Sequence, residues 1–316
     1  MAEKHEEFYG LKEAPFAITP DPRFFYESKQ HAGALVRIQH AIDGSRGLTV
    51  VIGDIGVGKT FVSRKLLEIL EQNLDKYEPS LFVVIHHEIT AAWLVKKLAI
   101  QLGCEKPAED KTTLISQICR RLTDIDRQNK KAVILIDEAH MFQTIEIYEE
   151  LRGLMNVESN DRKLLNIVLF GPPELDKYMG LDPPLVSRIG LKFNLTPLDE
   201  ASTGGLIKHR LKIAGCENEI FSAETVKVIH EYTSGIPRLI NGVCENCLFE
   251  GFLAKQKSIS PAAVEKAALD LGLSKSKDIV AKRSQPIADK KEETAEQEKA
   301  EKTSEQKEKR SSISFV

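Results

Sequence analysis

Long apolar runs, cysteines and net charge are all scarce in this sequence. No apolar stretch approaches the roughly 18 residues that a membrane-spanning helix needs, and the N-terminus has no apolar signal region. The 5 cysteines of the 316-residue chain are an odd number and lie far apart, which is typical of free thiols in a reducing compartment. We therefore expect a cytoplasmic protein without a transmembrane segment or a disulfide framework.

The net charge of −3 combines two unlike parts of the chain. Residues 274–316 carry 11 Lys and Arg against 9 Asp and Glu, a net of +2, which leaves −5 for the residues before them. Neither part is basic enough to indicate nucleic-acid binding by charge alone. Residues 272–316 have few apolar side chains, so we expect them to form a disordered, charged tail.

One short stretch carries most of the chemical information. The apolar run 48–52 is typical of a buried strand and leads into Gly53-Asp54-Ile55-Gly56-Val57-Gly58-Lys59-Thr60, which has the spacing G-x-x-x-x-G-K-T. The glycines let successive backbone N–H groups point into one concavity, where phosphates bind. Lys59 would reach the terminal phosphates and Thr60 would bind Mg²⁺, with Phe61 continuing into a helix. An ordinary tight turn is the alternative, but strand, loop and helix in this order favour a nucleoside triphosphate site.

An acidic motif follows a second buried strand, expected at 131–136, and reads Asp137-Glu138-Ala139-His140. Asp137 would complete the Mg²⁺ shell, and Glu138 would orient and polarise the attacking water. Asp-Glu pairs also cap helices, which is the alternative interpretation. Beside a P-loop, the motif favours phosphoryl transfer to water.

Strand and helix patterns alternate from residue 45 to residue 198. Further strands are expected at 81–85, 164–170 and 191–195. This alternation predicts an α/β fold with a doubly wound, parallel five-stranded sheet. Only helical patterns remain from 199 to 271, which predicts a small all-α domain. We expect Trp93, Cys244 and Cys247 to be core residues.

Residues 1–44 are dense in aromatic side chains and prolines. The prolines from Pro15 to Pro22 argue against regular structure there, and a helix is expected at 30–42. We expect this N-terminal arm and its helix to pack on the domain that follows. A lid over the base of a bound nucleotide is the second interpretation, because flat apolar walls suit a base.

Taken together, the motifs resemble those of AAA+ ATPases. The shared motifs are the P-loop, Asp137-Glu138-Ala139-His140, Ser187-Arg188-Ile189 and Gly235-Ile236-Pro237-Arg238. Others are similar to the secretion ATPases of the general secretion pathway protein A type, namely Phe8-Tyr9-Gly10-Leu11, Pro20-Asp21-Pro22-Arg23, Gly171-x-Pro173-Glu174-Leu175 and His209-Arg210-Leu211. The resemblance covers about residues 8–271. It implies a nucleotide-binding domain at 45–198 and a helical lid domain at 199–271.

The resemblance also implies ligands, partners and two further roles. Arg238 matches the lid arginine that contacts the γ-phosphate, and Arg188 matches the arginine finger that acts on a neighbouring subunit's site. A surface arginine at a helix end is the alternative for Arg188. ATP and Mg²⁺ are the implied ligands, and a homo-oligomer is the implied assembly. At Pro172 the family usually has Gln, which leaves the polar sensor unidentified, whereas Phe61 replaces a small polar residue with little expected effect.

Two functions remain open after the resemblance is considered. We expect an assembly or motor ATPase of a secretion or pilus system, cytoplasmic and peripheral at the inner membrane. Where the best-known relatives continue into a transmembrane helix and a peptidoglycan-binding module, this chain has its charged tail. The alternative is a DNA-linked AAA+ ATPase, a transposition helper or origin-recognition type, which the acidic core disfavours. The sequence offers no Q-x-x-G-R-x-G-R element, which excludes a superfamily-2 helicase.

Overall fold

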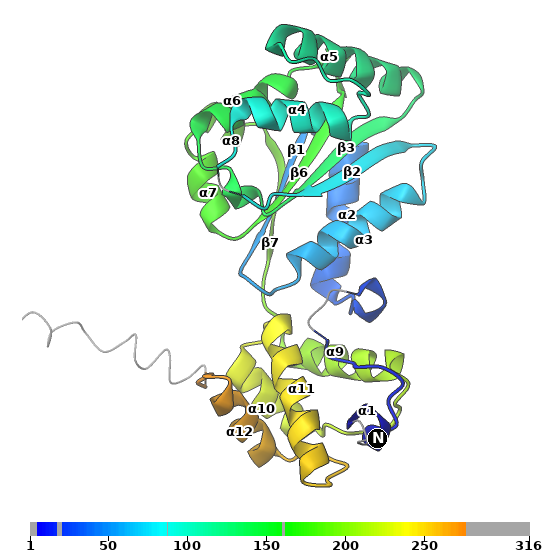
Figure 1. The fold of residues 1–316 in the computed structure, drawn as a ribbon, viewed down its shortest axis with the longest axis vertical. Coiled ribbons are helices and arrows are strands. Elements are labelled where there is room, and N and C mark those ends of the chain that lie inside the picture. Colours follow the sequence, from blue (N-terminus) through cyan, green and yellow to red (C-terminus); the bar gives the residue numbers. More distant parts are fainter. Residues whose placement is uncertain (1–4, 18–20, 87, 160–161, 276–316) are drawn as a thin grey trace, which may run out of the picture.

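The structure, a computed structural model, describes residues 5–17, 21–86, 88–159 and 162–275. An α/β part with a central sheet lies above a smaller group of helices in the view of Figure 1. Two segments connect them: the chain leaving strand β7 and the N-terminal arm that runs up to helix α2.

Five parallel strands form the main sheet, in the order β2-β3-β6-β1-β7. These strands are β1 (Leu48–Gly53), β2 (Tyr77–Val83), β3 (Lys131–Asp137), β6 (Leu165–Gly171) and β7 (Ile189–Leu195). The predicted parallel, doubly wound sheet is confirmed. Every residue of β1 and β6 is buried, as expected for continuous apolar runs in a sheet covered on both faces.

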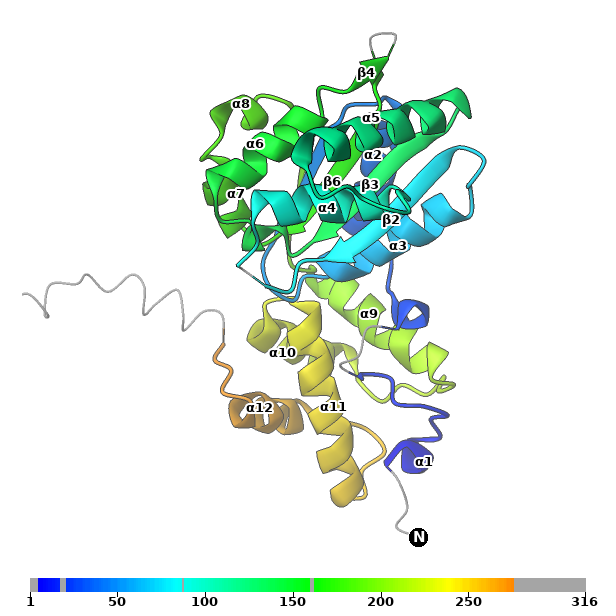
Figure 2. The same cartoon turned by 45° about the horizontal axis from the view of Figure 1, so that its top comes forward.

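Helices cover both faces of this sheet (Figure 2). One face carries α2 (Lys29–Asp43) and α3 (Lys59–Glu71), and the other carries α4 (Ala91–Gln101), α5 (Lys111–Arg127), α6 (Ile145–Leu154), α7 (Glu174–Met179) and α8 (Pro183–Val186). Successive residues of β1 point to opposite faces, so Val51 joins the core under α2 and α3 while Val50 and Ile52 join the other.

Three features of the sheet part differ from the prediction. Strand β2 begins at Tyr77, four residues earlier than expected, because its half-buried first part lacks an apolar run. It lies at the sheet edge, where Pro79 is tolerated without a backbone N–H. The expectation that Trp93 is a core residue is wrong, since it is 43% exposed in the first turn of α4. A two-residue hairpin of β4 (Glu158–Ser159) and β5 (Arg162–Lys163) was also not predicted.

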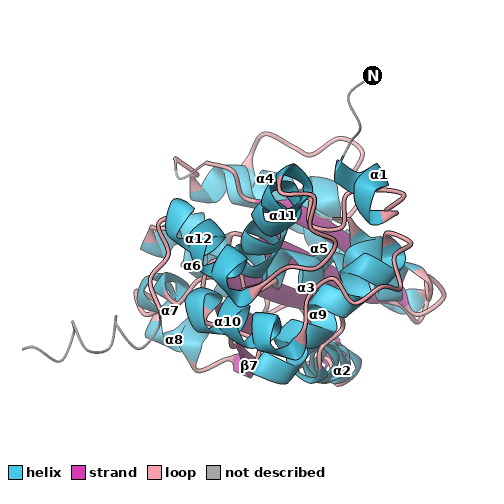
Figure 3. Cartoon of the chain, turned by 90° about the horizontal axis from the view of Figure 1, so that it is seen from below, coloured by secondary structure: helices cyan, strands magenta, loops and turns pink. Residues whose placement is uncertain are grey.

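The four helices after β7 form the predicted all-α part, seen in front of the sheet in Figure 3. They are α9 (Glu200–Ile213), α10 (Ala223–Thr233), α11 (Pro237–Leu253) and α12 (Pro261–Asp270). Asp199, Ser222 and Ser260 each cap the following helix by accepting a hydrogen bond from a backbone N–H in its first turn. Cys244 and Cys247 are fully buried in this core, as expected.

The N-terminal arm packs on a different partner from the one expected. Helix α1 (His5–Tyr9), the turn η1 (Pro22–Phe24) and the residues between them place their apolar side chains in the core of α9–α12, and only α2 lies on the sheet. The Arg210 guanidinium on α9 donates to the Pro15 carbonyl oxygen at 2.8 Å, and Tyr9 Oη donates to the Gln256 carbonyl oxygen at 2.9 Å. The arm therefore connects the helical part to α2 and, through α2, to the sheet.

The end of the described chain extends beyond the expected boundary at residue 271. Leu273 packs against the helical core, and Lys275 Nζ lies 2.6 Å from Glu265 Oε1. The disorder predicted for the tail concerns residues 276–316, which lie outside the described residues. Within the described ranges, no helix is both long and apolar enough to cross a membrane.

Candidate functional site

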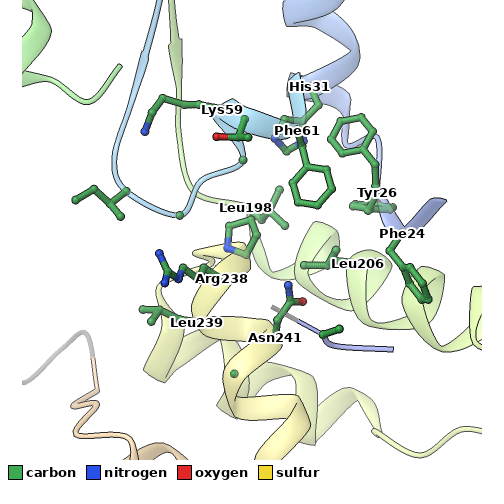
Figure 4. Close-up of a pocket in the computed structure, with 18 of the residues that line it drawn as sticks. Phe24, Tyr26, His31, Lys59, Phe61, Leu198, Leu206, Arg238, Leu239 and Asn241 are labelled. Carbon is green, nitrogen blue, oxygen red and sulfur yellow. The ribbon is translucent and has the colours of Figure 1, made fainter. Parts of the chain in front are cut away.

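A cavity of about 870 Å³ lies between the P-loop and the helices α9 and α11 (Figure 4). Its lining comes from five places in the chain: the arm, the P-loop, the segment after β3, the turn after β6, and the helices after β7. One end carries Lys59 and Arg238, while Phe24, Tyr26 and Leu206 lie at the other. The cavity thus has a cationic end and an apolar, aromatic end.

The P-loop glycines are required by conformation and by close contacts. Gly56 and Gly58 have φ angles of +86° and +106°, which side chains rarely adopt. A Cβ on Gly56 would lie 3.0 Å from Arg238 Cβ and 3.0 Å from Ile236 Cγ2, and one on Gly58 would lie 3.2 Å from His31 Nε2. The loop is therefore enclosed by α11 on one side and by α2 on the other.

Lys59 lies over the loop at the N-terminus of α3. Its Nζ donates to the carbonyl oxygens of Gly53 at 2.7 Å and Asp54 at 2.9 Å. Burial lowers the pKa of Lys59, and the carboxylates of Glu138 and Asp137 partly oppose that shift. The ammonium group is thus held at the cationic end of the cavity by carbonyl groups that a phosphate could replace.

Asp137 ends β3 and is buried beside the first turn of α3. Its Oδ1 accepts from the Glu138 N–H at 2.9 Å, and its Oδ2 accepts from Ser63 Oγ at 3.4 Å. Ser63 Oγ also lies 3.0 Å from the carbonyl oxygen of Thr60, which lines the cavity. The Asp137 carboxylate lies beside the Ser63 hydroxyl and close to Thr60 on the cavity wall. Mg²⁺ prefers oxygen ligands, so this donor set fits the ion. Ser63 was not recognised from the sequence.

Glu138 adopts a left-handed backbone conformation, with φ of +57° and ψ of 37°. Such conformations cost about 1–3 kcal/mol in residues other than glycine and cluster at functional sites. The Glu138 carboxylate lines the cavity, and its Oε2 lies 3.2 Å from His140 Nδ1. His140 lines the same cavity, and its buried Nδ1 makes no hydrogen bond within the described residues. Pro172 also lines the cavity, so an apolar ring stands where the family resemblance implied a polar sensor.

The N-terminus of α11 docks on the P-loop. The Arg238 N–H donates to the Gly56 carbonyl oxygen at 3.3 Å, and the Arg238 side chain lines the cavity. Pro237 occupies the first turn of α11, where its missing N–H has no cost. Lys59, Glu138 and Arg238, three of the four predicted catalytic residues, therefore line one cavity.

Arg188, the fourth predicted catalytic residue, lies elsewhere. It immediately precedes β7, whose first residue pairs with Leu48 at the start of β1. The P-loop follows the other end of β1, about 20 Å away at the rise of a parallel strand. The Arg188 guanidinium is exposed and donates to Asn156 Oδ1. Arg188 thus lies at the N-terminal ends of the strands, whereas the P-loop lies at their C-terminal ends.

Aromatic side chains form one wall of the cavity. Phe25 from the arm stacks on Phe61 from α3, with ring centroids 5.7 Å apart and an interplanar angle of 13°. Phe61, for which the sequence predicted little effect, is part of this wall. His31 Nε2 donates to the Val57 carbonyl oxygen at 3.3 Å, and its Nδ1 accepts from Ser28 Oγ at 2.8 Å. Burial lowers the pKa of His31, so the neutral ring fastens α2 to the P-loop.

The comparisons with known proteins agree with this architecture. Residues 42–179 match the AAA domain family, which agrees with the P-loop at residues 53–60 and the parallel sheet around it. It resembles general secretion pathway protein A of Aeromonas hydrophila, with 32% identity over 272 residues that cover 84% of this chain and 48% of that protein. An uncharacterised HTH-type transcriptional regulator of Methanocaldococcus jannaschii is 27% identical over 160 residues, covering 48% of this chain and 38% of that protein. The chain therefore spans about half the length, or less, of these relatives.

Solved structures share the fold at low sequence identity. The ORC2 protein of Aeropyrum pernix, in ADPNP and ADP complexes, has a TM-score of 0.60 at 16% identity, covering 81% of this chain and 71% of that one. Cdc6p of Pyrobaculum aerophilum has a TM-score of 0.58 at 16% identity, covering 79% and 70%. The Aeropyrum pernix ORC1 protein in complex with DNA has a TM-score of 0.60 at 16% identity, covering 82% and 69%. These likenesses confirm the predicted fold.

Proposed function

We propose that the protein binds ATP with Mg²⁺ in this cavity and hydrolyses it. The observation that carries the proposal is the convergence of Lys59, Glu138 and Arg238 on one cavity from distant parts of the chain. Its cationic end suits a triphosphate, and its aromatic end suits a base. The proposal includes a nucleotide-binding domain at 45–198 and a lid domain at 199–271.

Each side chain has a distinct part in the proposed reaction. Lys59 exchanges its two carbonyl partners for the terminal phosphate oxygens. Thr60 and Asp137 would hold Mg²⁺, which would supply positive charge to offset the charge developing on the phosphoryl oxygens. Glu138 orients the attacking water and accepts its proton. Arg238 donates to the γ-phosphate from the lid, so hydrolysis needs the lid docked on the loop.

Arg188 acts on a neighbouring subunit in this proposal. Arg188 lies at the opposite end of the strands from its own P-loop. In an oligomer, the Arg188 of one copy of the chain can reach the cavity of the neighbouring copy. A planar cation at the transferring phosphoryl group is a large part of catalysis in this class of reaction. The active form is therefore a homo-oligomer.

The proposed role is assembly or motor work for a secretion or pilus system, peripheral at the inner membrane. The likeness to general secretion pathway protein A, over 84% of this chain, supports this role. A pull-down with the full chain and with a variant ending at residue 275, read by mass spectrometry, tests it. Enrichment of secretion or pilus components is the expected result, and enrichment of recombination proteins would contradict it.

Nucleotide binding and turnover test the catalytic part. Lys59→Ala should weaken ATP binding, because the loop loses its phosphate-binding ammonium. Lys65→Ala is the matched control, since Lys65 lies on the same helix and pairs with Glu68 at 3.0 Å. Wild-type protein and Lys65→Ala should release phosphate from ATP only when Mg²⁺ is present. Equal ATP binding by Lys59→Ala and Lys65→Ala would contradict the assignment of Lys59.

A DNA-linked ATPase is the second candidate. The ORC1 structure was solved in complex with DNA, and one relative is named as an HTH-type regulator. Filter binding with duplex DNA at low salt separates the two candidates, because phosphate contacts make affinity fall steeply with salt. The secretion proposal predicts no saturable binding, and a salt-dependent isotherm would favour the DNA-linked candidate.

A further inference from the structure

Asn241 has a buried amide oxygen that no described residue satisfies. Its Oδ1 is enclosed by protein and accepts no hydrogen bond within the described ranges, although the residue lines the cavity. Leaving such a group unpaired costs about 1–3 kcal/mol. A buried, unpaired polar atom in a ligand cavity indicates a group that pairs when the ligand is present.

The position of Asn241 defines which part of a nucleotide it can meet. It follows Arg238 by three residues, so the two side chains share one face of α11. Figure 4 shows the amide pointing into the cavity, with Arg238 on one side and Leu206 with the aromatic residues on the other. The N-terminus of α11 is bonded to Gly56, which holds Asn241 in fixed relation to the phosphate loop. The amide therefore lines the same cavity as the phosphate loop, between its cationic end and its aromatic end.

The aromatic wall and the amide supply different properties. Stacking against the Phe25 and Phe61 wall accepts any base, because every base has a π-face. A carboxamide presents an acceptor and a donor side by side. On its N7 edge adenine presents the complementary pair, a donor at N6 and an acceptor at N7, whereas guanine presents two acceptors. Of the aromatic wall and the amide, the amide is therefore the group that can distinguish adenine from guanine.

We propose that Asn241 recognises the adenine of ATP, its Nδ2 donating to N7 and its Oδ1 accepting from the N6 amino group once the bound base displaces the side chains that enclose this oxygen. The inference rests on the proposed function and adds to it the residue that selects the base. Asn241 is then a specificity-determining residue on the lid. It lies one helix turn from Arg238, so the residue that contacts the base and the residue that contacts the γ-phosphate move together with α11. ATP should bind about 10- to 100-fold more tightly than GTP, the range for one such bidentate pair.

Binding of ATP, GTP and 7-deaza-ATP to the full chain, by isothermal titration calorimetry, tests this inference. The 7-deaza analogue replaces only the N7 acceptor by carbon. Wild-type protein should bind it about 10-fold more weakly than ATP, the order expected for one lost hydrogen bond to a buried donor. Asn241→Ala should bind ATP and 7-deaza-ATP equally, and Asn241→Asp, which keeps the size of the side chain but loses the donor, should do the same.

Asn246→Ala is the matched control, because that exposed amide on the same helix donates to the Gly242 carbonyl oxygen, at 2.8 Å. It should retain the wild-type preference. Circular dichroism verifies that each variant is folded. The inference is overturned if Asn241→Asp keeps the preference for ATP over 7-deaza-ATP, or if wild-type protein has none. If wild-type protein binds no ATP, both the proposed function and the role of Asn241 are overturned. If it binds ATP without hydrolysing it, only the proposed function is overturned.

Discussion

Gly56 is the point where the P-loop and the lid helix α11 meet, and its replacement by alanine tests that contact. The φ angle of +86° is in the left-handed region, which costs an alanine about 1–2 kcal/mol. The added Cβ would lie 3.0 Å from both Arg238 Cβ and Ile236 Cγ2, so α11 has to move away. That movement breaks the bond from the Arg238 N–H to the Gly56 carbonyl oxygen, worth about 1 kcal/mol. We expect a loss of about 2–3 kcal/mol in the free energy of unfolding.

Urea denaturation followed by circular dichroism measures this loss, and calorimetric titration with ATP measures its effect on binding. We expect ATP affinity to fall at least ~10-fold, because displacement of α11 withdraws Arg238 from the cavity. Gly33→Ala is the control: Gly33 lies within α2 with no atom within 4 Å of an added Cβ, and alanine there should gain up to about 1 kcal/mol. If Gly56→Ala resembles Gly33→Ala in stability and affinity, the docking of α11 on the loop is wrong.

Three further predictions concern His31, Arg210 and Arg188. Because burial lowers the pKa of His31 below its unfolded value of about 6.5, the unfolded state binds more protons just below that pH. The His31 contribution to the free energy of unfolding should be complete above pH ~6.5 and fall as the pH is lowered. Denaturation at pH 8 and pH 5.5 measures this, and His31→Gln should show a smaller difference between the two. Arg210→Met should cost about 1–3 kcal/mol, seen as an earlier urea midpoint, since the carbonyl of Pro15 loses its donor. Arg188→Ala should abolish turnover alone but regain part of it when mixed with Glu138→Gln subunits, and failure at every ratio in exchanging material would contradict a trans arginine.

The local motifs could be predicted because their chemistry lies in consecutive residues. The G-x-x-x-x-G-K-T spacing predicts a strand, a loop and a helix, and the structure has β1, the P-loop and α3 there. The Asp137-Glu138 pair follows an apolar run, and the structure places it at the end of β3. Arg238 came from family resemblance, since nothing in its own neighbourhood of the sequence places it beside Gly56.

Contacts between distant residues were not predictable from the sequence. The arm has apolar residues that need burial, but no local pattern says that Phe16 and Phe24 pack on α9–α12 rather than on the sheet. His31 is 26 residues from Val57, and it reads as an ordinary helix residue until the fold brings them together. Asn241 sits in a helix pattern among apolar neighbours, and only the cavity shows that its amide faces a ligand site.

Glu138 is the residue whose replacement tests the central claim most directly. The measurement is single-turnover hydrolysis of ATP with Mg²⁺ by the full chain, with ATP binding measured in parallel. Glu138→Gln should bind ATP like wild-type protein and hydrolyse it at least ~100-fold more slowly, as expected for loss of a general base. Glu146→Gln, an exposed carboxylate in the first turn of α6, should retain wild-type turnover. Hydrolysis at the wild-type rate by Glu138→Gln would contradict the account of this site.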